Sequence, residues 1–167
     1  MKVLETDRLV LRWLERSDAS FVLALVNDPS WLRYIGDKGV KSVGDAERYI
    51  ENGPAAMFSR FGHGLNRVEL KSDGRPIGIC GLIKRETMDD VDLGFALLPE
   101  FRGAGYAYEA AAATVAHGRS VLGFSRIVAI VSPDNEASCR LLERLGFRLE
   151  RMVQLGVDRE ELKLYAV

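Results

Sequence analysis

Residues 102–107 have the sequence Arg-Gly-Ala-Gly-Tyr-Ala, which is typical of a loop that binds an anion. Glycines let a ligand approach the main chain closely, and the loop leads into an Ala-rich segment with helical spacing at residues 106–120. The first amides of a helix lack intrahelical acceptors and point outward at the positive end of the dipole, so a phosphate fits there. Arg102 could add a forked, charge-assisted contact. The glycines alone could equally form only a tight turn.

A second polar segment lies further along the chain, at the start of a predicted helix at residues 135–145. Asn135 is suited to cap the amino end of this helix, and Ser138 follows about one turn later. Gly146 stands where a left-handed C-cap is expected, and Phe147 behind it is the usual hydrophobic partner. Both ends of this helix are therefore marked in the sequence.

The elements that must position these segments alternate between helical and strand-like patterns. The Ser72-Asp73-Gly74 turn between two alternating runs indicates a β-hairpin, and Pro99 closes a third run. The first predicted elements are a strand at 8–14, a helix after the Ser17-Asp18 cap that includes 21–26, and a helix that is opened by a capping box at 42–45 and interrupted at Gly53-Pro54 before Phe61. Strands follow at 65–71, 75–84 and 91–98, then a helix at 106–120 and a strand at 126–131. A helix at 135–145 and two closing strands at 147–154 and 161–166 complete the chain order.

Composition excludes several classes of protein. The chain has 167 residues, 47% hydrophobic and 28% charged, which predicts one folded domain over residues 1–167. A net charge of -1 gives no general attraction to nucleic acid. Cys80 and Cys139 lack the spacing of a metal site or a disulfide framework. With no apolar leader or membrane-spanning run, we expect a cytoplasmic protein that does not bind membranes.

The two polar segments together resemble a known family. Residues 102–107 are similar to the R-x-x-G-x-A acyl-CoA loop of GNAT acetyltransferases, and residues 133–138, with Leu145-Gly146-Phe147, resemble the second conserved block of that superfamily. Residues 5–12 and 106–110 resemble the branch typified by ribosomal-protein alanine N-acetyltransferases. The resemblance covers essentially the whole chain, and the two blocks occur in the expected order and spacing.

The resemblance implies an α/β (α+β) fold with a mixed, mainly antiparallel central sheet of about six to seven strands and helices on both faces. It implies that the fourth and fifth predicted strands, 91–98 and 126–131, splay apart and that acetyl-CoA lies in the gap. The implied activity is transfer of an acetyl group from acetyl-CoA, as co-substrate, to a primary amine by direct attack on the thioester. The implied partner is a small-molecule amine or a protein N-terminus, and a homodimer is compatible with the family.

The family's coenzyme-binding residues can be carried over onto this chain. The resemblance places the diphosphate on the main chain of the loop and the pantetheine amides along the strand that ends before it. Asn135 matches a residue that contacts the pantetheine arm, and Ser138 matches a serine near the sulfur. The implied coenzyme-binding residues are Leu97, Leu98, Arg102, Gly103, Ala104, Gly105, Tyr106, Ala107, Asn135 and Ser138.

The proton-transfer groups are less well marked. Leu142 occupies the position where many members have a tyrosine general acid, so that tyrosine is excluded here. The resemblance makes Ser138 the catalytic candidate near the sulfur, although this serine could instead only bond within the first turn of its own helix. For the base, Asp92 is the main candidate, with Glu86 and Asp89 in the preceding turn; each could instead be a solvated surface charge. His63, expected in a loop, is not a candidate.

Other residues have structural interpretations of their own. His117 is expected near a helix end and Cys139 on a helix surface or in packing. Trp13, Trp31 and Tyr34 are expected in the core or in a wall, and residues 29–39 fall where the family builds its acceptor pocket. We expect no metal site.

Two alternative functions stay open at this point. A non-catalytic acyl-CoA-binding or sensory module would keep the loop without the acid and base, and Leu142 leaves room for that hypothesis. A dinucleotide-binding fold also places a glycine loop between strand and helix, but here the loop follows an antiparallel hairpin and lacks G-x-G-x-x-G spacing. The acceptor amine is not identified by the sequence.

Overall fold

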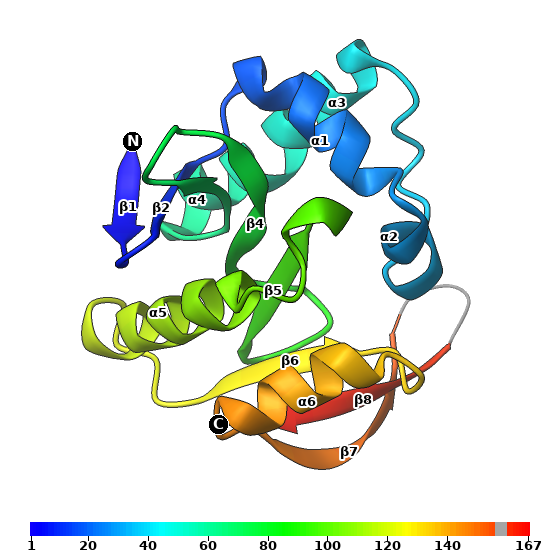
Figure 1. Cartoon of the computed structure of the whole chain (residues 1–167). Helices are drawn as coiled ribbons and strands as arrows, with labels where there is room; N and C mark the ends of the chain where they lie inside the picture. The colour runs from blue at the N-terminus through cyan, green and yellow to red at the C-terminus, as the bar shows by residue number, and fades with distance from the viewer. Residues whose placement is uncertain (156–159) are drawn as a thin grey trace.

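A single mixed sheet organises the computed structural model, which describes residues 1–155 and 160–167 (Figure 1). In this part of the chain eight strands are ordered β1-β2-β3-β4-β5-β6-β8-β7. Every neighbouring pair is antiparallel except β5 with β6, so the expected mixed, mainly antiparallel sheet is confirmed. The strands are β1 (Lys2–Glu5), β2 (Leu9–Trp13), β3 (Leu65–Leu70), β4 (Pro76–Ile83), β5 (Val91–Leu97), β6 (Ile127–Val131), β7 (Arg148–Gln154) and β8 (Glu161–Ala166).

The sheet is one strand wider than the six to seven expected, because Lys2–Glu5 forms the edge strand β1. This strand pairs with β2 across a turn in which the Thr6 amide donates to the Leu9 carbonyl oxygen at 2.9 Å. A four-residue edge strand carries little alternation of its own, so its pairing depends on the neighbouring strand.

Helices cover both faces of the sheet, as expected (Figure 1). Helices α5 and α6 pack in one hydrophobic cluster with β2 to β6, whereas α1 and α3 pack in a second cluster on the other face. The helices are α1 (Ala19–Val26), α2 (Pro29–Tyr34), α3 (Val43–Ile50), α4 (Ala56–Phe61), α5 (Tyr106–Ser120) and α6 (Glu136–Arg144), with shorter helical turns at Arg16–Asp18, Glu51–Ala55 and Pro99–Phe101.

Side-chain caps and one widened turn explain the helix boundaries on the amino-terminal side. Ser42 caps α3 by accepting from the Asp45 amide at 3.0 Å, as its capping box predicts. The interruption predicted at Gly53-Pro54 is a π-helical turn, Glu51–Ala55, which accommodates a proline that has no amide to donate. The Asp18 side chain does not cap α1; it accepts from the Glu15 amide at 2.8 Å instead.

Helix α2 is not among the elements predicted from the sequence, and it follows α1 after only two residues. Asp28 caps α2 by accepting from the Ser30 amide at 3.2 Å, and Pro29 occupies its first turn. A proline with its fixed φ angle suits this position, so the same residues end one helix and begin the next.

Small side chains bring α5 close to the sheet. Ala110 and Ala111 are buried against it, and a Cβ atom added at Gly118 would lie only 2.7 Å from the Leu82 side chain and 3.1 Å from that of Ile127. The Ala-rich composition therefore fixes how deeply α5 packs, as predicted, and with it the position of the loop that precedes the helix.

The sheet opens between β5 and β6. These parallel strands pair only at their start, where Val91 lies opposite Ile127 and Asp92 opposite Val128. Beyond Asp92 the two strands diverge, which confirms the expected splay between the strands predicted at 91–98 and 126–131. Residues 93–97 of β5 therefore present one free edge toward the gap.

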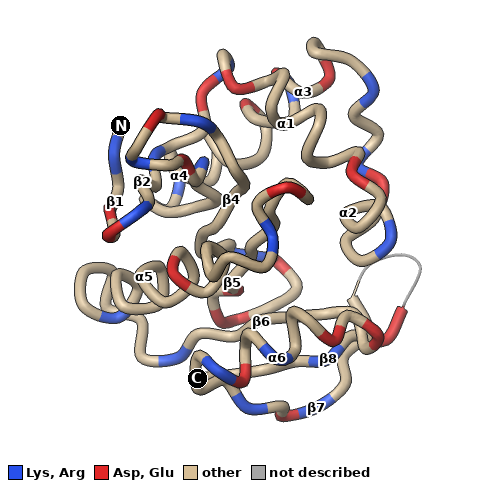
Figure 2. The backbone as a smooth tube through the Cα atoms, viewed as in Figure 1, with Lys and Arg blue, Asp and Glu red and all other residues tan. Residues whose placement is uncertain are grey.

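Charges of both signs are distributed along the chain. Figure 2 shows basic and acidic residues interspersed over the same elements, in keeping with the net charge of -1. Among residues 1–155 and 160–167, no helix combines the length and apolar character needed to cross a bilayer.

Candidate active site

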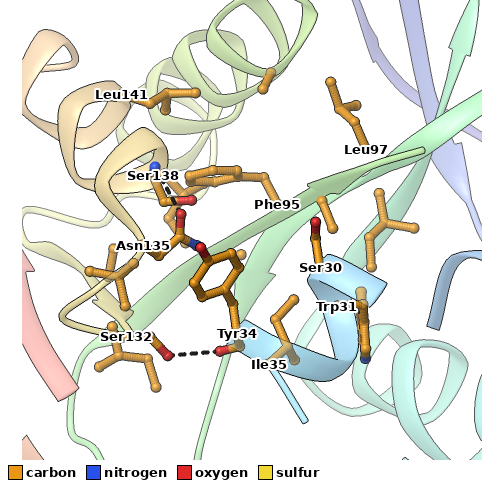
Figure 3. Close-up of a pocket in the computed structure, with 18 of the residues that line it drawn as sticks. Ser30, Trp31, Tyr34, Ile35, Phe95, Leu97, Ser132, Asn135, Ser138 and Leu141 are labelled. Carbon is orange, nitrogen blue, oxygen red and sulfur yellow. Dashed lines mark hydrogen bonds between the residues drawn. The ribbon is translucent and has the colours of Figure 1, made fainter. Parts of the chain in front are cut away.

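A cleft of about 450 Å³ lies where β5 and β6 diverge. Its walls come from α2, β5, β6, the loop before α5 and the start of α6, so segments from all parts of the sequence meet there (Figure 3). Of the residues expected to bind coenzyme, Leu97, Arg102, Gly103, Ala107, Asn135 and Ser138 line this cleft.

The amino end of α5 carries unpaired main-chain donors. Gly103 and Gly105 have φ angles of 82° and 83°, a left-handed conformation that favours glycine. Gly105 is the N-cap and supplies no side-chain acceptor, and the amides of residues 103–108 have no hydrogen-bond acceptor among the described residues. Such a row of donors at the positive end of a helix is suited to an anion.

The Arg102 side chain forms several hydrogen bonds within the protein that the sequence did not predict. Its guanidinium donates to Asp28 Oδ2 at 2.7 Å, to Ser30 Oγ at 3.1 Å and to the Leu97 carbonyl oxygen at 2.9 Å. The Arg102 amide donates to the Pro99 carbonyl oxygen at 3.2 Å, so it is not one of the free amides. These contacts tie α2 to the end of β5; the charge of Arg102 lies beside the loop but is balanced by Asp28.

Only some main-chain groups on the free edge of β5 point toward the cleft, where a ligand could reach them. The Leu98 amide donates to the Ile77 carbonyl oxygen at 2.8 Å, and its carbonyl oxygen accepts from Phe101, so Leu98 faces β4 and has no free group. Because main-chain groups alternate in direction along a strand, the amides of Leu97 and Phe95 face the gap. Of the two expected residues, only Leu97 has an amide turned toward the cleft.

Two polar side chains at the start of α6 face the cleft. The Asn135 side chain accepts from the Ser138 amide at 3.3 Å and so caps the helix, as predicted. This bond uses its oxygen and leaves its Nδ2 group to donate elsewhere. Figure 3 shows the Ser138 and Tyr34 hydroxyls in the same part of the cleft as Asn135. At the other end of α6, Gly146 has a φ of 92° and the Phe147 amide donates to Leu142, as the C-cap predicted.

Asp92 is the titratable group that the cleft buries most deeply. It is 1% exposed, and Arg85 Nε donates to its Oδ2 at 2.7 Å. Its Oδ1 has no hydrogen-bond partner among the described residues. Burial raises the pKa of Asp92, and the charge and hydrogen bond of Arg85, together with the main-chain amide of Ile130, oppose part of that rise. Glu86 and Asp89, the other carboxylates considered, do not line the cleft.

Several other residues considered in the sequence have structural roles. His63 lies in a buried loop with Nδ1 at 2.7 Å from the Leu82 carbonyl oxygen, and His117 lies in the last turn of α5. Cys139 is buried in the core and Trp13 packs on Phe58 with ring centroids 4.6 Å apart, so neither lines the cleft.

The wall opposite α6 is formed partly by α2 and the loop that follows it. Residues 29–39 were expected near the acceptor, and Trp31, Tyr34 and Lys38 from this segment line the cleft. Ser132 Oγ donates to the Tyr34 carbonyl oxygen at 3.0 Å, which ties α2 to the β6 side (Figure 3). Tyr49 and Arg85 also line the cleft and were not anticipated, because nothing in their local sequence distinguishes them from ordinary surface or packing residues.

The fold agrees with comparisons to known proteins. A family model described as an acetyltransferase (GNAT) domain matches residues 8–148. The chain belongs to the GNAT acetyltransferase family. The match includes both the loop before α5 and helix α6, and it establishes the enzyme class as N-acetyltransferase.

Named relatives of this GNAT protein come from several bacteria. YoaA of Bacillus subtilis (strain 168), an uncharacterized N-acetyltransferase, is 34% identical over 154 residues, covering 91% of this chain and 86% of that protein. The crystal structure of an acetyltransferase from Agrobacterium tumefaciens C58 is 27% identical, with a TM-score of 0.83 over 100% of this chain and 94% of that one.

A third similar structure is RimL, a ribosomal L7/L12 α-N-protein acetyltransferase in complex with coenzyme A. It has a TM-score of 0.85, with 19% identity, over 100% of this chain and 97% of that one. At this identity the likeness concerns the GNAT fold alone.

In residues 1–155 and 160–167 of this GNAT protein, no group of three or more His, Cys, Asp and Glu side chains is arranged to hold a metal ion. The polar groups that line the cleft are main-chain amides, hydroxyls, the Asn135 side chain, the two buried carboxylates of Asp28 and Asp92, and a few basic side chains.

Proposed function

We propose that the protein transfers an acetyl group from acetyl-CoA to a primary amine that enters the cleft between β5 and β6. The observation that carries this proposal is the row of unpaired amides at residues 103–108, which opens beside the cleft at the start of α5. A coenzyme diphosphate would supply the anion that these donors lack.

The shape of the cleft supports the same placement of the coenzyme. From the loop, a pantetheine arm could follow the free edge of β5, where the Leu97 and Phe95 amides face the gap, and pass the Asn135 side chain. The thioester supplies an activated acyl group. One of the β5 amides could donate to the oxyanion that forms when the amine attacks its carbonyl carbon.

Asp92 is suited to act as the base. An amine must be neutral to attack, and the attacking nitrogen must lose a proton afterwards. Asp92 Oδ1 is free to accept a proton, directly or through water, while Oδ2 is held by Arg85. Because burial raises the pKa of Asp92, it is a stronger base than an exposed aspartate.

The departing thiolate needs a proton or a hydrogen-bond donor. Leu142 lines the cleft where a tyrosine is common in the family, so the donor must come from elsewhere. We assign it to Ser138, whose own amide is fixed by Asn135 and whose hydroxyl is not engaged with another described residue. Tyr34, on the opposite wall, is the second hydroxyl in this region.

The test is release of free thiol from acetyl-CoA by the purified protein in the presence of primary amines, with the acetylated product identified by mass spectrometry. Thiol release that requires an amine supports the proposal. Tight binding of acetyl-CoA without acetylation of any amine, peptide or small molecule would support the alternative, a non-catalytic acyl-CoA-binding module.

A further inference from the structure

The cleft that contains Asp92 is lined by one more basic than acidic side chain. Lys38, Arg85 and Arg102 are its basic residues, and Asp28 and Asp92 its acidic ones. Asp28 pairs with Arg102 and Asp92 with Arg85, both at 2.7 Å. Lys38 is left over, since its ammonium forms no hydrogen bond or ion pair with any described residue, and the carboxylate of Asp37 beside it pairs with Lys41 at 3.2 Å.

Arg85 also retains unused donors. Only its Nε donates to Asp92, so its two terminal nitrogens have no partner in residues 1–155 and 160–167. Lys38 and Arg85 line the same cleft. The pKa of Lys38 is lowered, first by partial burial of its ammonium and further by repulsion from the Arg85 charge. A ligand that carries an anionic group would relieve this repulsion and use both sets of donors.

These two cations lie in the same cleft as a buried acceptor. Asp92 Oδ1, buried and unpartnered, is suited to hold an ammonium or amine, and the half-buried Tyr49 lines the wall near Arg85. The cleft thus pairs one site for an amine with one site for an anion. It has no surplus carboxylate among the described residues to hold a second ammonium group.

We propose that the acceptor is a primary amine that also carries a carboxylate, which Lys38 and Arg85 bind while the amine lies against Asp92. The inference deepens the proposed function and rests on it for the identity of the reaction. The inference predicts that amino acids, and peptides with an acidic residue next to the reacting N-terminus, are better acceptors than polyamines and neutral amines.

The experiment compares three acceptors of equal length: γ-aminobutyrate, n-butylamine and putrescine. For the wild-type chain with acetyl-CoA, we expect kcat/KM for γ-aminobutyrate to exceed that for each of the others by about tenfold or more, the value of a charge-assisted hydrogen bond. The dipeptide amides Ala-Asp-NH2 and Ala-Lys-NH2, of which only the first carries a carboxylate, form a second pair. A value of kcat/KM for Ala-Asp-NH2 larger than that for γ-aminobutyrate identifies a peptide as the source of the carboxylate.

Substitution of Lys38 tests whether this residue causes the preference for an acceptor that carries a carboxylate. Lys38→Glu should raise KM for γ-aminobutyrate about tenfold, with little change in kcat, and should raise kcat/KM for putrescine. The matched control is Lys41→Glu, an equal change of charge three residues away on a side chain that pairs with Asp37 and does not line the cleft. The control should leave all three acceptors unchanged.

Binding of the same compounds to the protein with free CoA, measured by calorimetry, gives a readout that needs no reaction. Carboxylate-dependent binding lost in Lys38→Glu, with no turnover of any amine, would uphold this inference and contradict the proposed function. Turnover with putrescine or butylamine favoured over γ-aminobutyrate, or a carboxylate preference that survives Lys38→Glu, would overturn the inference and leave the proposed function standing.

Discussion

Arg85 Nε donates to Asp92 Oδ2 at 2.7 Å, which leaves the other oxygen of this buried carboxylate without a partner among the described residues. A structural ion pair in a protein interior normally has all its oxygens satisfied. The half-satisfied arrangement costs stability and is placed in the cleft, so we interpret it as a feature of catalysis rather than of folding.

Asp92→Asn should therefore separate activity from stability. We expect kcat/KM to fall about 100-fold or more, because a general base is removed. The thermal midpoint should be unchanged or higher at pH 8, since the substitution removes a buried charge and frees only the partly exposed Arg85. Acetyl transfer and thermal unfolding are measured on the same sample. If the thermal midpoint instead falls strongly while the folded fraction keeps the wild-type kcat/KM, Asp92 has a structural role.

Removing Arg85 should shift the pH dependence of the reaction. Burial raises the pKa of Asp92 and the Arg85 charge lowers it, so Arg85→Met should raise it further. A base acts in its ionised form, and activity is lost as the pH falls through its pKa. The acid limb of kcat/KM should therefore move to higher pH in the variant. Arg60→Met, at a side chain that does not line the cleft, is the control, and an acid limb that stays in place would show that Asp92 is not the group that titrates.

How much the sequence could predict depends on whether a contact is local. The cap of Asn135, the left-handed Gly146 and the hairpin at residues 72–74 each depend on neighbours within a few positions, and the structure confirms all three. Edge strand β1 and helix α2 were missed because their signals are short and their stability comes from pairing with elements elsewhere in the chain.

The site itself shows the same division. Its anion-binding loop could be recognised from consecutive residues, but the engagement of Arg102 with Asp28 joins positions 74 residues apart. The grouping of Lys38, Tyr49, Arg85 and Asp92 likewise brings together helix α3, strand β5 and two loops. No periodicity or local motif encodes such a cluster, because it exists only once the sheet has formed.

Ser138→Ala tests the proton donor. We expect kcat to fall about 100-fold, as for loss of a general acid, with little change in the KM for the amine. The variant keeps the Ser138 amide that Asn135 caps, so α6 should stay intact. Ser120→Ala is the control, because its hydroxyl donates to the Ala116 carbonyl oxygen at the far end of α5. If Tyr34→Phe shows the loss instead, the donor lies on α2.

Asp18 should contribute to stability without affecting the reaction. It is 3% exposed and accepts from Arg12 and Arg67 at 2.9 Å and 2.7 Å. Burial alone would raise its pKa, but the hydrogen bonds from Arg12, the Glu15 amide and Arg67 together lower it. Asp18→Asn should cost about 2 kcal/mol in the free energy of unfolding at neutral pH, measured by urea denaturation.

This contribution has a defined pH dependence. A carboxyl group whose pKa is lowered by folding stabilises the protein above its ordinary pKa, and the effect is lost as the pH falls through the lowered value. The difference between Asp18→Asn and the wild type should therefore shrink in acid. Asp37→Asn, at an exposed side chain, should have a much smaller effect at any pH. A difference that grows in acid would contradict the assignment.

The central claim is that the amides at the start of α5 hold the coenzyme's diphosphate, and calorimetric titration with acetyl-CoA of the wild type, Gly103→Ala and Gly123→Ala tests it most directly. Both glycines have a positive φ with nothing within 4 Å of an added Cβ, so the two substitutions strain the backbone alike. We predict that acetyl-CoA binds the wild type and Gly123→Ala with equal affinity. Its affinity for Gly103→Ala should be lower by about tenfold or more. Equal affinity in all three proteins, or no binding to the wild type, would contradict the account.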